Sequence, residues 1–275
     1  MEWSRYAAVV AEYDALLSYA KEVSASLIGL APANPHHGYG EQIFVKLLAH
    51  CITLRQLSPD PERKTPKELW DLASVSAIAR SIIETHDALM YVALGAITLE
   101  ERQFRILLWE LHDSNRRAKM LEAIGSTDPR YLDIVANDQQ LHERVLAHQF
   151  FARLSKSVQG KVRDRDPPPF HLTQRERCSA YRINFDYYNA VTMQLSQYVH
   201  TLPYSVHQLF AFKAGSPEGL HLMSLPIQYT LAFLSRSIQG LVELFPDHIP
   251  APKPAVQRLI AVWSAFVERG AKSAV

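Results

Sequence analysis

The stretch SVSAIARSIIETHDALMYVALGAI, residues 74–97, decides the fold class. At about 100° per residue, a helix places Arg80, Glu84, Asp87 and Tyr91 within about 60° of one another. A helix that is apolar around most of its circumference is typically buried. The segment is therefore predicted to be an interior helix with one polar stripe. The apolar side chains that cover its other sides are Ile78, Ile82, Ile83, Leu89, Met90, Val92 and Leu94.

The rest of the chain also has the pattern of helices. Proline, glycine and capping residues separate segments with helical apolar spacing, and no sustained alternating run predicts a strand. Two helix starts have the form of a capping box, Thr65-Pro66-Lys67-Glu68 and Thr173-Gln174-Arg175-Glu176. We expect an all-α protein, a multi-helix bundle of eight or nine helices. The expected ranges are 4–30, 39–57, a helix from 65 that continues through the quoted stretch, 98–125, 128–161, 173–201, a short helix after Pro203, a long one from 217 to 245, and a last one that ends at Gly270.

The chain is predicted to form a single all-α domain over residues 1–275. Its stiffest polar connection is Asp164-Arg165-Asp166-Pro167-Pro168-Pro169. If the chain has two lobes, we expect their boundary at residues 164–173.

Composition and charge exclude several classes of protein. The 275 residues hold 29 Lys and Arg against 28 Asp and Glu, a formal charge of +1, which does not support a non-specific nucleic-acid binder. The two cysteines, Cys51 and Cys178, form no CxxC motif, which favours a reducing cytoplasm. The N-terminus lacks the pattern of a secretory signal, and the uncharged run 219–235 is shorter than the roughly 20 apolar residues of a membrane span. We expect a soluble cytoplasmic protein without a membrane segment.

A second polar stripe lies on the predicted helix 173–201. Arg182, Asp186, Asn189, Met193, Ser196 and His200 share one of its faces. If this helix faces residues 74–97, five side chains build one polar pocket in an apolar bundle: Arg80, Glu84, Asn189, Ser196 and His200. The expected occupant is a small polar or phosphate-bearing ligand or a protein partner, because guanidinium groups bind phosphate and carboxylate well. The sequence indicates no cofactor, and it is compatible with an oligomer.

Simpler interpretations of these residues stay open. Arg80 and Glu84 are four residues apart, so they form an ordinary surface ion pair if the helix is exposed on that side. His200 lies near the end of a helix that Pro203 stops, where a histidine caps carbonyls and interacts favourably with the helix dipole.

The segments Arg80-Ser81-Ile82-Ile83-Glu84 and Leu195-Ser196-Gln197-Tyr198-Val199-His200 resemble an uncharacterised bacterial family of helical proteins. That family has an RSxxE helix followed by an LSxxVH helix, and the resemblance covers roughly residues 70–205. It implies that Arg80, Glu84, Ser196 and His200 belong to one site. It implies no known reaction.

The family is in turn distantly similar to HEPN domains, all-α modules of defence and toxin systems in which an Arg and a His on one helix cleave RNA without metal. Downstream of Arg182 the matching positions hold Tyr187, Tyr188 and Asn189 instead of His. A composite site is chemically compatible with this sequence instead, with Arg80 for phosphate and His200 as the acid or base. A HEPN-like ribonuclease is one enzyme alternative.

A metal-dependent enzyme is the other alternative. The dipeptides His86-Asp87 and His112-Asp113 resemble the motif of HD phosphohydrolases, all-α enzymes in which His and Asp hold a divalent ion that activates water. His86, His112 and Asp113 would be the ligands. The Gly that typically follows the pair is replaced by Ser114, and the chain has no HExxH motif. Otherwise His112 and Asp113 lie on an exposed helical face, and we expect no metal.

Overall fold

The computed structural model describes residues 1–63 and 69–270, and it is all-α, as predicted. These residues form eleven α-helices, one π-helical turn and one 3-10 turn, with no strand among them. The helices are α1 Trp3–Ser26, α2 Pro35–Leu57, α3 Leu72–Leu89, α4 Leu99–Ala123, α5 Arg130–Ala147, α6 Lys156–Arg163, α7 Gln174–Ala180, α8 Phe185–Val199, α9 Pro203–Ala211, α10 Pro217–Leu244 and α11 Pro254–Arg269. The π turn covers Met90–Leu94 and the 3-10 turn covers Gln149–Arg153.

The chain separates into two compact units. Unit 1 consists of Met1–Met90 and of the chain from Cys178 onward, and unit 2 consists of Tyr91–Arg177. Unit 2 is thus an insertion within the sequence of unit 1. The expected lobe boundary at residues 164–173 lies inside unit 2, whose last residue is Arg177.

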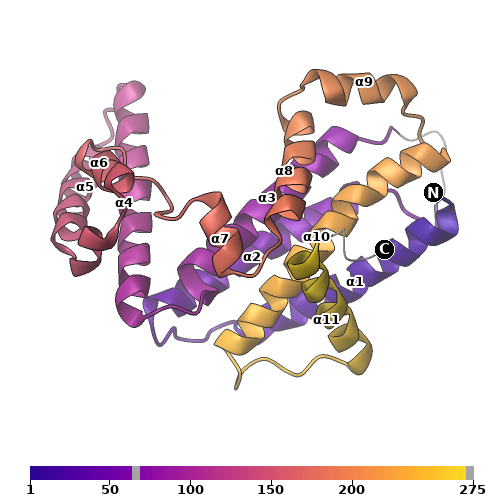
Figure 1. Cartoon of the computed structure of the whole chain (residues 1–275), viewed down its shortest axis with the longest axis horizontal. Helices are drawn as coiled ribbons and strands as arrows, with labels where there is room; N and C mark the ends of the chain where they lie inside the picture. Colours follow the sequence, from indigo (N-terminus) through magenta and orange to yellow (C-terminus); the bar gives the residue numbers. More distant parts are fainter. Residues whose placement is uncertain (64–68, 271–275) are drawn as a thin grey trace. The chain divides into compact units, whose positions relative to one another are not determined.

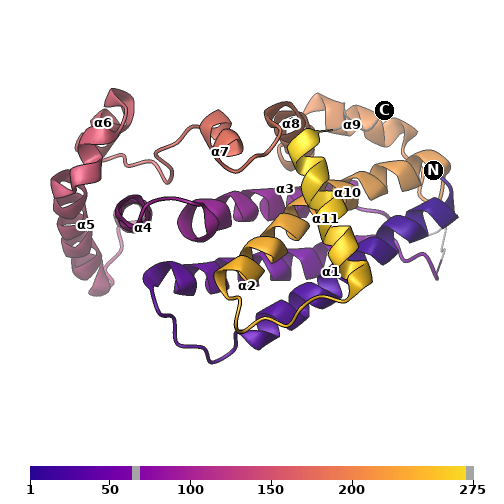
Figure 2. The same cartoon turned by 60° about the horizontal axis from the view of Figure 1, so that its bottom comes forward.

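Unit 1 is built around four helices that pack in a ring, α1 on α2, α2 on α3, α3 on α10 and α10 on α1 (Figures 1 and 2). Outside this ring, α8 packs on α3 and α11 packs on α10. The core holds large side chains from each member of the ring, including Tyr13, Phe44, Ile82 and Phe233. Pro226 lies inside α10, and the Thr230 hydroxyl donates to the Pro226 carbonyl at 2.9 Å.

Unit 2 has its own core, formed mainly where α4 packs on α5. Its buried side chains include Phe104, Leu108, Leu141, Phe151 and Val162. The Thr98 hydroxyl caps α4 by accepting from the Glu101 amide at 3.2 Å.

The helix count exceeds the prediction because two expected helices are interrupted. The expected helix 128–161 ends at Ala147, where His148 is extended, and α6 starts again at the Ser155 cap. The expected helix 173–201 is divided into α7 and α8 by a turn at Arg182, which has a positive φ of 55°. The helix start predicted at Thr65-Pro66-Lys67-Glu68 lies outside the described residues.

Candidate functional site

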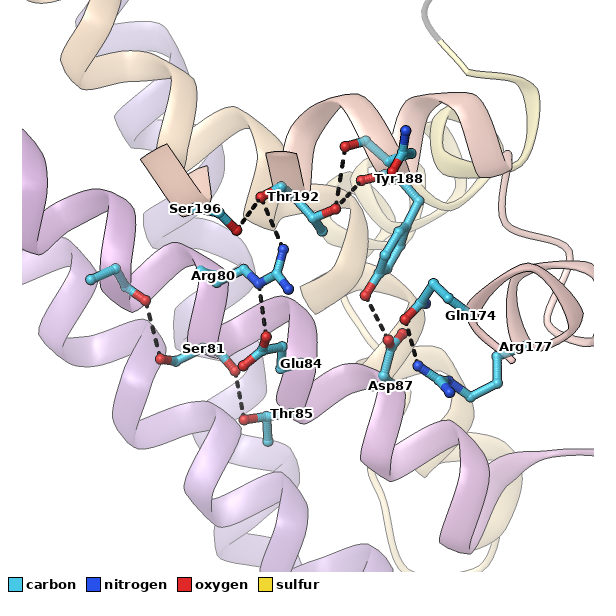
Figure 3. A network of polar contacts seen from close by, with 12 residues as sticks. Arg80, Ser81, Glu84, Thr85, Asp87, Gln174, Arg177, Tyr188, Thr192 and Ser196 are labelled. Carbon is cyan, nitrogen blue, oxygen red and sulfur yellow. Dashed lines mark hydrogen bonds and ion pairs between the residues drawn. The ribbon is translucent and has the colours of Figure 1, made fainter. Parts of the chain in front are cut away.

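The two helices that carry the predicted stripes, α3 and α8, pack on each other within unit 1 (Figure 3), but most of the α8 stripe is exposed to solvent. The Arg80 guanidinium joins the two helices. Its Nε donates to Glu84 Oε1 at 2.8 Å on the same helix, and its Nη1 donates to the Thr192 carbonyl of α8 at 2.9 Å. The side chain therefore has a fixed direction along the seam between the helices.

Local sequence explains why both helices start where they do. The Asp71 side chain accepts from the Ser74 amide at 2.9 Å and caps α3, and hydrogen bonds from Ser74 lower the pKa of this carboxyl. The Asn184 side chain caps α8 in the same way through the Tyr187 amide, at 2.9 Å. Arg80 lies about two turns after the start of α3, where this helix packs on α8.

Hydroxyl groups near Arg80 donate to backbone carbonyls of their own helices. Ser196 Oγ donates to the Thr192 carbonyl at 2.8 Å, so this carbonyl accepts from both Ser196 and Arg80 (Figure 3). On the α3 side, Ser81 donates to the Ala77 carbonyl at 3.1 Å and Thr85 to the Ser81 carbonyl at 2.7 Å. The Ser196 oxygen keeps acceptor capacity for another group.

The five residues of the predicted pocket are partly or largely exposed, which corrects the expectation of a buried pocket and agrees with the simpler interpretation of Arg80 and Glu84 as a surface ion pair. The Arg80 side chain is 26% exposed and the Glu84 side chain 57%. Asn189 and His200 are exposed on α8 and at its C-terminal cap, and Ser196 is half-buried. Of the five predicted residues, Arg80, Glu84 and Ser196 are brought together through their own contacts and the Thr192 carbonyl. No contact joins the Asn189 or His200 side chain to that group in the described part of the chain.

The buried polar contact between these helices is a pair that the predicted site omitted. The Tyr188 hydroxyl donates to Asp87 Oδ2 at 2.7 Å, and both residues are buried (Figure 3). Burial, and then the negative charge of Asp87, raise the pKa of Tyr188 well above its ordinary value, so the hydroxyl stays a donor. Helical spacing places Asp87 on the first stripe, but the pattern alone does not pair it with Tyr188.

Arg182 and Tyr91 leave the two stripes to which the sequence assigned them. Arg182 lies in the turn before α8 and pairs with Glu268 at 2.5 Å. Tyr91 lies in the π turn and belongs to unit 2, where its hydroxyl bonds His171 Nδ1 at 2.7 Å and Arg105 stacks 4.5 Å from its ring centre. Arg105 is fully buried and pairs with Glu101 at 2.6 Å. These groups are mutually satisfied, which fits a structural role.

The residues of the metal-dependent alternative do not form a metal centre in the described structure. His86 is fully buried in unit 1, where its Nδ1 bonds the Ser237 hydroxyl at 2.9 Å and its ring packs on Phe233. Burial, and then the positive charge of Arg236, lower the pKa of His86 to about 3. In unit 2, His112 Nδ1 bonds the Pro167 carbonyl at 2.8 Å, and Asp113 pairs with Arg117 at 2.9 Å on an exposed face. Within residues 1–63 and 69–270, no three His, Cys, Asp or Glu side chains form a group that could hold a metal ion.

None of the described helices is both long and apolar enough to cross a membrane. Comparison of the chain with protein-family models, with curated proteins and with solved structures gives no match. The resemblance to the RSxxE and LSxxVH family therefore stays a prediction, and any function has to be argued from the residues themselves.

Proposed function

We propose that unit 1 binds a small polar ligand with an anionic group, and that Arg80 holds this group at the seam between α3 and α8. The observation that carries the proposal is the way Arg80 is fixed. Its Nε and Nη1 are held by Glu84 and the Thr192 carbonyl, while no described residue bonds its second terminal nitrogen, Nη2. A guanidinium fixed in one direction loses little entropy when its free edge binds a phosphate or carboxylate.

The neighbours of Arg80 favour a certain kind of ligand. Ser196 offers an acceptor oxygen, and Glu84 offers an exposed carboxylate beside the guanidinium. A second negative group on the ligand would be repelled by Glu84, whereas a hydroxyl or amino group would be attracted. The site thus suits a ligand that combines one phosphate or carboxylate with hydrogen-bond donors.

Thermal unfolding in the presence of AMP or inorganic phosphate at low ionic strength tests this proposal. A ligand that binds the folded state raises the melting temperature as its concentration increases. We expect a rise for the natural chain that Arg80→Gln abolishes, each protein being compared with its own melting temperature without ligand. The rise should be larger for AMP, which carries hydroxyl and amino donors, than for phosphate.

Arg55→Gln is the matched control for this experiment. Arg55 is also a half-buried arginine of unit 1, 24% exposed, and its Nε pairs with Asp14 at 2.8 Å. It should keep the response of the natural chain. The proposal fails if neither probe stabilises the natural chain, or if Arg80→Gln and Arg55→Gln respond alike.

A second candidate, HEPN-like metal-independent RNA cleavage, rests on the position of His200. Ser196 and His200 follow Thr192 at intervals of four residues, so they lie on the same side of α8 as Thr192, whose carbonyl accepts from Arg80. His200 is exposed and accessible to a large substrate. Single-stranded RNA incubated with the protein and EDTA should be cleaved, and His200→Gln should abolish the cleavage while His207→Gln, another exposed histidine of unit 1, retains it. Uncleaved RNA, or equal activity of the two variants, would contradict this candidate.

A further inference from the structure

Helix α9 in unit 1 has its apolar side exposed. Val206, Leu209 and Phe210 occupy positions i, i+3 and i+4 and therefore form one stripe. Their side chains are 37%, 54% and 84% exposed. In an ordinary amphipathic helix such a stripe lies against the core.

Two polar residues of α9, Ser205 and Gln208, lie on the inner side instead, whereas His207 is exposed beside Phe210. Ser205 is buried and donates to the Leu202 carbonyl at 2.8 Å, and Gln208 accepts from the Tyr198 hydroxyl of α8. Gln208 also donates to the Tyr204 hydroxyl at 2.8 Å. Beyond the end of the helix, Phe212 packs against Trp70. These contacts fix the rotation of α9, so the outward direction of the apolar stripe is set by specific bonds.

The same part of the chain carries no formal charge. From Tyr187 to Phe212 the sequence contains no Asp, Glu, Lys or Arg, a run longer than 219–235. Many of these residues are exposed, including Met193 at 56% and Leu202 at 38%. Solvent-facing helices normally carry charged side chains, whereas the centres of subunit interfaces are depleted in them and enriched in Phe, Tyr and Met.

We propose that the α9 face, defined as Leu202, Val206, Leu209 and Phe210, is the surface through which two copies of this chain form a dimer. A two-fold interface places the same patch on both subunits, so a charge on or near the axis meets its own copy. A patch without charges is complementary to itself. Interfaces with unrelated soluble partners are on average about as polar as the rest of the surface, and helices that bind membrane surfaces carry Lys and Arg on their polar side. Neither description fits residues 187–212.

The exposed area is of the right order for such an interface. Together with Tyr204 of the same helix, the α9 face exposes apolar side chains of roughly 500 Å², given side-chain areas on the order of 150–220 Å². Stable interfaces bury about 800 Å² per partner. The polar atoms that surround these side chains can supply the remainder.

Light scattering coupled to size exclusion, at increasing concentrations of the full chain, tests the proposal. One chain has a mass of 31.2 kDa, and we expect twice that mass for the natural protein. Phe210→Glu would place two carboxylates at the two-fold interface and should weaken the dimer at least about tenfold. Ile28→Glu is the control, because Ile28 also lies in unit 1 and is 80% exposed but is remote in sequence from α9. It should leave the dimer intact.

Two results would overturn the proposal. One is a natural chain that stays monomeric at every concentration. If that monomer also floats with phosphatidylcholine vesicles, the α9 face binds lipid instead. The other is a dimer that Phe210→Glu and Ile28→Glu affect equally. Circular dichroism of both variants separates loss of the dimer from loss of the fold. The test does not involve Arg80, so it succeeds or fails independently of the proposed ligand site.

Discussion

Two neighbouring tyrosines of α8 allow a stringent test of what holds α3 against α8. Tyr188 and Tyr187 are both buried, but only the Tyr188 hydroxyl has a partner, Asp87 Oδ2 at 2.7 Å. The Tyr187 hydroxyl bonds no described group. Substitution by Phe removes one oxygen from each and leaves the ring in place.

The two substitutions should therefore differ in their effect on stability. A hydrogen bond to a charged group contributes about 1.5–3 kcal/mol, so Tyr188→Phe should lower the free energy of unfolding by about 2 kcal/mol. For a unit of this size that corresponds to a decrease of about 4–8 °C in melting temperature. Tyr187→Phe removes a buried hydroxyl without a partner and should change stability by less than about 0.5 kcal/mol, or increase it.

Urea denaturation and scanning calorimetry of the two variants measure the difference. The double variant Asp87→Asn with Tyr188→Phe should lose less free energy of unfolding than the sum of the losses of the two single variants, because both substitutions remove the same contact. Equal destabilisation by Tyr187→Phe and Tyr188→Phe would refute the reasoning, since it would show that the Asp87 contact contributes nothing beyond burial of the ring.

Three further predictions concern unit 1. The pKa of His86 is lowered in the folded protein, so His86 binds fewer protons there than in the unfolded chain. The free energy of unfolding should therefore fall as the pH drops from about 6.5 toward 3, and His86 should contribute at most about 1.4 kcal/mol of this loss per pH unit. Urea denaturation at several pH values should show a shallower decrease for His86→Gln. Asp71→Ala removes the α3 cap and should cost about 1 kcal/mol, and Asp71→Asn, which keeps an acceptor, should cost less in the same assay. Gly219→Ala should lower the melting temperature, because the new Cβ collides with the Lys213 carbonyl oxygen, whereas Gly160→Ala, with open space around it, should not.

The sequence predicted those features of the fold that depend on neighbours along the chain. The capping box at Thr173 is present, with the Glu176 amide donating to the Thr173 hydroxyl at 3.3 Å and Glu176 Oε2 accepting from the Thr173 amide at 2.7 Å. The break before α8 could not be predicted, because contacts with α11 hold it. The Asn184 amide donates to the Val267 carbonyl at 2.9 Å, and Arg182 pairs with Glu268.

The candidate site was predictable only in part for the same reason. Helical spacing placed Arg80 and Ser196 each on a polar stripe, and the structure connects them through the Thr192 carbonyl. Spacing gives the direction of a side chain relative to its own helix but not how deeply that side is covered, so the sequence could not decide between a buried pocket and the exposed positions that Glu84 and His200 have. The apolar stripe of α9 shows the same limit, because its pattern alone predicts an inward face.

The insertion of unit 2 within unit 1 has a consequence for synthesis on the ribosome. Residues 1–90 leave the ribosome before residues 91–177, and α8, α10 and α11, which pack on the helices of residues 1–90, follow only after both. Unit 2 is contiguous in sequence, and its α4 and α5 can pair as soon as they are made. Unit 1 therefore stays incomplete for the time that the ribosome needs to translate the whole of unit 2. During that interval only contacts among α1, α2 and α3, or binding by chaperones, keep their apolar faces from aggregating.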